Sequence, residues 1–319
     1  MTKNELRIIF MGTPPFAAES LRTLVEDGYS IAAVVTAPDK PVGRHGNTLQ
    51  PSAVKQYALS VGLPVLQPES LKDETFIREL QRYNANLQIV VAFRMLPEIV
   101  WKMPELGTFN LHASLLPQYR GAAPINHAII NGETETGVTT FFLENGMDTG
   151  KIILQQQIPI GESDDAGIMH DKLMTLGARL VERTLEILIL ADGHISALPQ
   201  HFLTETYEVL HPAPKISRET CRIDWTKSAA EIYNHIRGLS PHPGAWTELT
   251  APKGEKLPLK IFQSEKIFEK HSLPCGTVIS DGKKHIDIAV SDGYIRLQSL
   301  QPSGRKRMNA KEFLNGTKL

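Results

Sequence analysis

The chain has 319 residues, 41% hydrophobic and 22% charged, which is typical of a globular protein long enough for two domains. It contains no apolar run of about 18 residues, which argues against a membrane-spanning helix. Its two cysteines are too few for a disulfide framework or a structural zinc site. Residues 1–206 carry 16 basic and 23 acidic side chains, net −7, whereas residues 207–319 carry 18 and 12, net +6. The basic half suits a polyanionic partner, or it simply keeps a small domain soluble.

The first half of the chain alternates strand-like apolar runs with amphipathic, helix-like segments. The expected strands are residues 7–11, 31–35, 64–66 and 87–93, and the expected helices are residues 16–27, 52–61 and 70–82, the last capped by Ser70. Such alternation predicts an α/β fold with a Rossmann-like, mostly parallel sheet and helices on both faces. In sheets of this kind, ligands bind beyond the carboxyl ends of the strands.

A strongly helical segment at residues 171–191 ends at Asp192-Gly193, and a proline-rich stretch follows it. We therefore expect domains at residues 1–191 and 215–319, joined by a linker at 192–214. The second domain combines a helix with short strands between prolines and glycines, namely a helix at 228–239 and strands at 260–262, 276–280, 285–290 and 294–300. This pattern predicts a smaller C-terminal, OB-like β-barrel.

The chain lacks the glycine-rich motifs of dinucleotide and ATP sites and the common hydrolase motifs. The segment that follows Thr108 is more informative, because Asn110 and His112 share one face of an expected strand while Leu111 faces the core. An amide can donate to an oxygen that becomes negative during a reaction, and an imidazole can move a proton near neutral pH. Taken alone, the pair is better explained as two satisfied polar groups at a strand end.

Asp148 lies in a turn between Gly146 and Gly150, which can present its carboxylate with little steric cost. A carboxylate that reaches the imidazole would select its tautomer. The alternative is a turn in which Asp148 bonds to its own backbone.

These residues stand within a longer set of motifs. In chain order the motifs are Ile8–Pro14, Pro38–Arg44, Asn110-Leu111-His112, Ser114–Pro117, Arg120–Ile125, Asp148-Thr149-Gly150, Ile223-Asp224-Trp225, Ile236-Arg237, Pro243-Gly244-Ala245 and Leu297–Pro302. The set resembles the formyltetrahydrofolate-dependent formyltransferases over nearly the whole chain. The flanking motifs point to the branch of that family that formylates methionyl-tRNA for translation initiation.

The resemblance implies that 10-formyltetrahydrofolate is the co-substrate and initiator methionyl-tRNA the partner, with no metal. It assigns catalysis to Asn110, His112 and Asp148. The implied folate-site residues are Ser114, Leu115, Leu116 and Pro117, together with Phe93, Arg94 and Met95. The implied tRNA contacts are Lys40 and Arg44 in the long loop at 36–51, and Lys283, Lys284, Arg305, Lys306 and Arg307 in the basic half.

Two features depart from the family pattern. His45 to Thr48 are less basic than is usual after the Gly-Arg pair, and the loop at Arg94 is about one residue shorter, with arginine where glycine is usual. Two rival hypotheses stay open: a formyltransferase for an amino sugar nucleotide or other small amine, and a non-catalytic RNA-binding or folate-sensing protein. We expect a cytoplasmic monomer, because the sequence suggests no signal peptide and no oligomer interface.

Overall fold

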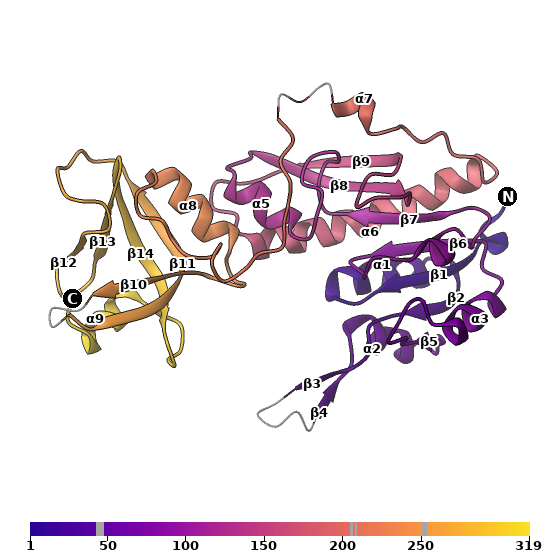
Figure 1. Ribbon diagram of the computed structural model, residues 1–319, viewed down its shortest axis with the longest axis horizontal. Coiled ribbons are helices and arrows are strands. Elements are labelled where there is room, and N and C mark those ends of the chain that lie inside the picture. The colour runs from indigo at the N-terminus through magenta and orange to yellow at the C-terminus, as the bar shows by residue number, and fades with distance from the viewer. Residues whose placement is uncertain (43–47, 205–206, 208, 251–253) are drawn as a thin grey trace. The chain divides into compact units, whose positions relative to one another are not determined.

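The computed structural model describes residues 1–42, 48–204, 207, 209–250 and 254–319, which form two compact units (Figure 1). One unit contains Met1–Arg120, Gly137–Ile158 and His170–His211, and the other contains Gly121–Thr136, Pro159–Met169 and Pro212–Leu319. Two short segments that precede residue 191 therefore belong with the C-terminal residues.

A twisted sheet forms the centre of the first unit, in the order β5-β2-β1-β6-β7-β8-β9. Its strands are β1 (Arg7–Gly12), β2 (Ser30–Val35), β5 (Val65–Leu66), β6 (Leu87–Val91), β7 (Thr108–His112), β8 (Glu135–Phe142) and β9 (Ile152–Pro159). Strands β5, β2, β1, β6 and β7 run parallel, and β8 is antiparallel to β7. The predicted mostly parallel sheet is confirmed, and β8 and β9 extend it by an antiparallel edge.

Helices cover both faces of this sheet, as predicted. Val90 packs with Phe76 and Leu80 of α3 (Glu74–Arg82) on one face, whereas Leu111 meets Gly177 of α6 (Ala166–Leu190) on the other. A Cβ at Gly177 would lie 2.7 Å from Leu111, so the glycine permits this close approach. The helices are η1 (Lys3–Glu5), α1 (Pro15–Glu26), α2 (Ala53–Ser60), α3 (Glu74–Arg82), α4 (Glu98–Trp101), α6 (Ala166–Leu190) and α7 (His201–Thr204).

Two predicted helix starts are wrong. Helix α3 begins after Asp73, whose carboxylate accepts a hydrogen bond from the Phe76 N–H at 2.9 Å, so Asp73 and not Ser70 is the cap. Helix α6 begins at Ala166, five residues earlier than its apolar pattern indicated. In both cases local hydrogen bonds and packing determine the first residue of the helix, which the apolar periodicity of the sequence does not reveal.

The long loop at 36–51 contains a small hairpin of β3 (Lys40–Val42) and β4 (Thr48–Gln50), and residues 43–47 lie outside the described part. Polar contacts hold its base. Asp39 accepts hydrogen bonds from Lys55 at 2.6 Å and from Gln67 at 2.8 Å. The Thr36 and Ser52 hydroxyls lie 2.8 Å apart. The hairpin thus leaves the sheet from an anchored base.

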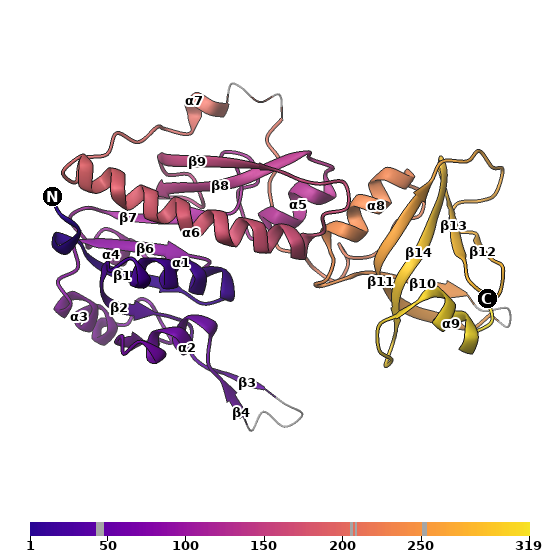
Figure 2. The same cartoon turned by 180° about the vertical axis from the view of Figure 1, so that it is seen from behind.

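The second unit contains an antiparallel sheet in the order β10-β11-β14-β13-β12, with β15 beside β14 (Figure 2). Its strands are β10 (Ala245–Thr250), β11 (Lys256–Ile267), β12 (Val278–Ser280), β13 (Ile286–Val290), β14 (Gly293–Pro302) and β15 (Met308–Asn309). Its helices are α5 (Pro124–Ile130), α8 (Ala229–Gly238) and α9 (Ala310–Gly316). Helix α8 packs on β11, and Ile232 and Ile236 join Ile261 and Leu300 in one core. The predicted smaller C-terminal β-barrel domain is confirmed, and its sheet is an antiparallel half-barrel; strands β10 and β15 and helices α5 and α9 were not predicted.

Candidate active site

Asn110 and His112 lie on β7, whose carboxyl end is flanked by β6 and β8. They share the face opposite to Leu111, as the alternation of side chains along a strand requires. Oδ1 of Asn110 is buried and accepts no hydrogen bond within the described part of the chain. A buried amide oxygen without a donor costs free energy, and native proteins rarely leave one unexplained. A bound ligand with an N–H group is one partner that would satisfy it.

Both ring nitrogens of His112 have neighbours that define their roles. Nε2 lies 2.9 Å from the carbonyl oxygen of Tyr119. Since a carbonyl can only accept, Nε2 carries a hydrogen. Nδ1 lies 3.9 Å from Oδ2 of Asp148, within reach of an ion pair but longer than a direct hydrogen bond. The two side chains are 8% and 14% exposed, so this contact is shielded from bulk water.

Tyr119 is a functional neighbour that the sequence did not indicate. Its φ of +58° lies in the left-handed region, which an L residue occupies only where its surroundings hold it. Its N–H donates to the His211 carbonyl at 2.7 Å, and its ring stacks on the His211 ring with centroids 5.9 Å apart. Residue 211, ninety-two positions further along, therefore holds the carbonyl that selects the His112 tautomer.

Asp148 sits in a tight turn between β8 and β9. Its φ is +54° and that of Gly146 is +112°. A Cβ at Gly150 would come within 1.7 Å of the Phe142 carbonyl oxygen, so only glycine fits there. As the sequence suggested, the two glycines allow a tight turn, and this turn brings the Asp148 carboxylate near His112.

The segment Ser114–Pro117 is held largely by bonds to the protein itself. The Ser114 hydroxyl donates to the Gln118 carbonyl at 2.6 Å, and Leu116 is fully buried against Phe141 and Ile152. The Leu116 side chain therefore belongs to the core and is not available to a ligand.

Two further side chains, which the sequence did not indicate, hold this segment in place. Thr139 Oγ1 accepts a hydrogen bond from the Leu116 N–H at 3.2 Å and donates to the Ser114 carbonyl at 2.6 Å. Gln155 donates to the Leu116 carbonyl at 2.8 Å and to the Thr139 hydroxyl at 2.9 Å. A polar pair on β8 and β9 thus positions the loop that follows His112.

The residues Phe93, Arg94 and Met95 follow the carboxyl end of β6. The Arg94 guanidinium donates to the carbonyls of Pro68 and Glu69 at 2.8 and 2.9 Å, and lies 5.3 Å from the Phe93 ring. Arg94 therefore braces the neighbouring loop. Phe93 is half-buried against the core that contains α3, and the Met95 side chain is 70% exposed.

The suggested RNA contacts lie on exposed turns. Lys40 is exposed at the start of β3, and Arg44 lies outside the described residues. Lys283 and Lys284 are exposed on the turn between β12 and β13. Oδ1 of Asp281 accepts hydrogen bonds from the backbone N–H groups of His285, Lys284 and Lys283, and these bonds lower the pKa of its carboxyl.

Arg305, Lys306 and Arg307 lie on the turn between β14 and β15, and all three are exposed. Arg307 is partly committed to the protein, because its guanidinium donates to the Ser299 hydroxyl at 2.6 Å and lies 4.5 Å from the Phe262 ring. Arg305 and Lys306 are the freer cations of this cluster.

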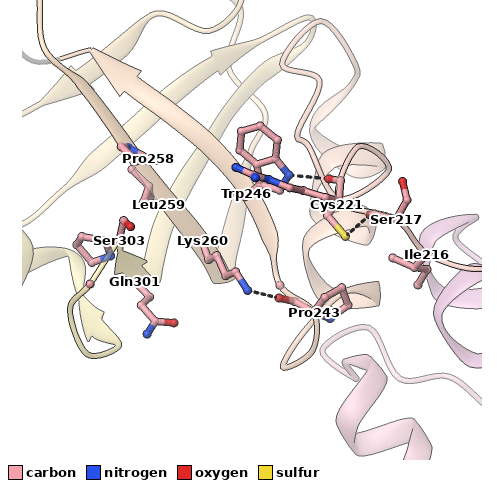
Figure 3. A pocket seen from close by; sticks show the side chains of 14 residues that line it. Ile216, Ser217, Cys221, Pro243, Trp246, Pro258, Leu259, Lys260, Gln301 and Ser303 are labelled. Atoms are coloured by element: carbon pink, nitrogen blue, oxygen red, sulfur yellow. Dashed lines mark hydrogen bonds between the residues drawn. The ribbon is translucent and has the colours of Figure 1, made fainter. Parts of the chain in front are cut away.

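A pocket of about 630 Å³ opens in the second unit beside Trp246 and Lys260 (Figure 3). The Lys260 ammonium donates to the Pro243 carbonyl at 2.7 Å, and the Trp246 indole donates to the Arg218 carbonyl. Burial raises the pKa of the Cys221 thiol, which disfavours the thiolate needed for nucleophilic chemistry. The described lining residues offer no acid–base pair comparable with His112 and Asp148.

The side chains in the described ranges form no cluster of three or more histidines, cysteines or carboxylates that could hold a metal ion. Within the same ranges, none of the helices has the length and apolar character needed to cross a membrane.

With the fold and this site established, comparison with known proteins places the chain. Residues 6–185 match the family described as formyl transferase, and residues 215–318 match its C-terminal domain. The chain therefore belongs to the formyl transferase family. Structures of an N-formyltransferase from Helicobacter canadensis, with folinic acid and dTDP-3-aminofucose, and of HypX from Aquifex aeolicus, with tetrahydrofolic acid, share the fold. Their TM-scores are 0.63 and 0.61 at 20% identity; the first match covers 95% of this chain and 100% of that one, and the second 99% and 48%.

Much closer relatives carry one particular name. The proteins called methionyl-tRNA formyltransferase from Parabacteroides distasonis and Bacteroides thetaiotaomicron are 61% and 57% identical to this chain. Each match covers 100% of this chain and 98% of the relative. The protein of that name from Porphyromonas gingivalis is 51% identical over 99% of this chain and 97% of its own length.

Proposed function

We propose that this chain transfers the formyl group of 10-formyltetrahydrofolate to the α-amino group of methionyl-tRNA, giving N-formylmethionyl-tRNA for translation initiation. One observation carries the proposal: an orphaned amide oxygen on Asn110 shares a strand face with His112, whose Nδ1 is 3.9 Å from the Asp148 carboxylate. The choice of acceptor is supported by the names of the relatives that are 61% and 57% identical to this chain over its full length.

The residues fit this chemistry. The folate, when bound, supplies an electrophilic formyl carbon on its N10 atom. As the amine attacks, a new carbon–nitrogen bond forms, the bond from the carbon to N10 breaks, and a proton of the amine ends on N10. The amine of an aminoacyl ester is a weaker base than a lysine side chain, so part of it is neutral and nucleophilic near pH 7.

We assign each member of the trio a separate task. The Asn110 amide donates to the formyl oxygen, where negative charge develops, and its own oxygen accepts an N–H of the incoming amine. His112, with a proton on Nδ1, stabilises the same charge and passes a proton towards N10. Asp148 orients the ring and attracts that proton, while the Tyr119 carbonyl keeps the Nε2 hydrogen in place.

Backbone groups fit the folate better than most of the side chains named for it. Of the segments at 114–117 and 93–95, Ser114 and Leu116 are fully buried and Arg94 is bonded to carbonyls at 68 and 69. We therefore propose that Phe93–Met95 contact the folate mainly through backbone N–H and C=O groups, and that Ser114–Pro117 do so through the backbone groups that Thr139, Gln155 and Gln118 do not bind. Leu115, half-buried and beside Gly137, and the exposed Met95 are the side chains best able to add apolar contact.

We propose that the exposed cations contact phosphates of the tRNA. The set is Lys40 and Arg44 with Lys283, Lys284, Arg305, Lys306 and Arg307. It draws support from the net charge of +6 on residues 207–319. We further propose the domain division at 191 and 215, a monomeric state and a cytoplasmic location.

The decisive experiment is formylation by the full chain of initiator and elongator methionyl-tRNA with 10-formyltetrahydrofolate, next to an amino sugar nucleotide as alternative acceptor. We expect product with initiator methionyl-tRNA, less with the elongator, and none with the sugar. Transfer to the sugar alone would replace the proposed acceptor, and the absence of any transfer would refute the enzyme assignment.

A further inference from the structure

The Gln200 side chain makes four hydrogen bonds next to the turn that carries Asp148, although it comes from the segment expected as a linker. Its amide nitrogen donates to the carbonyls of Asp148 and Gly150, both at 2.8 Å. Its amide oxygen accepts from Nε and Nη2 of Arg120 at 3.0 and 2.6 Å. Gln200 is 3% exposed, so water competes little for these bonds.

The turn requires such an external support. Asp148 occupies the left-handed region at φ +54°, which is unfavourable for an L residue and persists only where the surroundings hold it. The two carbonyls that Gln200 binds flank Thr149, so the bonds grip the backbone on both sides of the bend. Oδ2 of Asp148 lies 3.9 Å from Nδ1 of His112, and a rotation of this turn would increase that distance.

Arg120 completes the arrangement from the other side. Burial lowers the pKa of its guanidinium, and the Asp148 carboxylate acts in the opposite direction. The guanidinium is thus close enough to Asp148 to respond to its charge. Two N–H groups of Arg120 donate to the Gln200 amide oxygen and so orient the amide. Both hydrogens on the amide nitrogen then point to the carbonyls of the turn.

We infer that Gln200 is a positioning residue: it holds the Asp148 turn so that the carboxylate faces Nδ1 of His112, and Arg120 sets the direction of its amide. The inference rests on the role proposed above for Asp148. It predicts that the chemistry depends on a residue of the 192–214 segment that touches neither substrate.

The test uses two variants of the full chain. Gln200→Ala removes all four bonds, and Gln200→Glu keeps the size and the acceptors for Arg120 but places a carboxylate against two carbonyls. We expect both to lower kcat by about 10- to 100-fold, as small misplacements of catalytic groups do, with KM for methionyl-tRNA and for the folate within about twofold. Normal kcat in Gln200→Glu would refute the positioning role, because the two bonds from the side-chain nitrogen to the turn would then be dispensable.

Asn86→Asp is the matched control. Its amide also bonds two backbone groups, the Glu5 carbonyl at 2.7 Å and the Arg7 N–H at 2.8 Å, but at the amino ends of β1 and β6. It should leave kcat unchanged, so a similar fall there would mean that general loosening of the unit explains the result. In the Asp148→Asn background, adding Gln200→Ala should lower kcat by less than about threefold further, because the carboxylate that Gln200 positions is already absent. Full additivity would contradict the inference.

A spectroscopic readout separates this inference from the proposed function. The nuclear magnetic resonance shifts of the His112 ring nitrogens should change in Gln200→Ala and stay at wild-type values in Asn86→Asp. An unchanged His112 signal in Gln200→Ala would overturn the positioning role even if the enzyme is active. If the wild-type chain shows no formylation activity but the His112 signal still changes in Gln200→Ala, the proposed function alone is refuted.

Discussion

Replacing Asn110 by alanine should remove activity without removing stability. The amide is assigned to the developing negative charge on the formyl oxygen, and loss of one such donor costs about 10²–10³ in rate, or about 2.7–4 kcal/mol in the transition state. The free energy of unfolding should change little. Asn110 Oδ1 has no donor among the described residues, and an orphaned buried polar atom costs about 1–3 kcal/mol, which offsets the small cavity left behind.

The assay pairs initial rates of methionyl-tRNA formylation with urea unfolding of the same samples. We expect kcat to fall at least 100-fold in Asn110→Ala, while the free energy of unfolding stays within about 1 kcal/mol of wild type. Asn86→Ala should show the reverse, a loss of about 1–3 kcal/mol from two hydrogen bonds at unchanged kcat. Near-normal turnover in Asn110→Ala, or a loss of stability large enough to explain its inactivity, would refute the reasoning.

Three further predictions concern a half-buried histidine, a core leucine and a basic turn. Burial lowers the pKa of His235 below its ordinary 6.5, so the unfolded chain binds the proton more readily. Stability should then be complete above about pH 6.5 and decline as the pH falls below it, as urea midpoints at several pH values can show; in His235→Gln that decline should shrink. Leu116→Ala should cost about 3–5 kcal/mol of stability in thermal unfolding, since Leu116 is fully buried. Lys283→Ala with Lys284→Ala should weaken tRNA binding and reduce its salt slope by about 2, measured as Kd against salt; an unchanged slope would exclude both as phosphate contacts.

The sequence by itself determined those features that are written in local patterns. Apolar runs such as residues 7–11 and 87–93 predicted β1 and β6, because buried strands of a parallel sheet need apolar side chains on both faces. The two-residue spacing of Asn110 and His112 placed them on one face, since side chains alternate along a strand. The glycines beside Asp148 predicted a tight turn, because glycine alone tolerates the required backbone.

Tertiary structure alone decided which distant groups meet. Tyr119, Gln200 and His211 carry no local pattern, yet they select the His112 tautomer and hold the Asp148 turn through hydrogen bonds across up to 92 residues. Leu116 reads as a loop residue and proves to be core, because its burial depends on Phe141 and Ile152. Periodicity records which way a side chain faces, whereas the partner it finds there depends on how the whole chain folds.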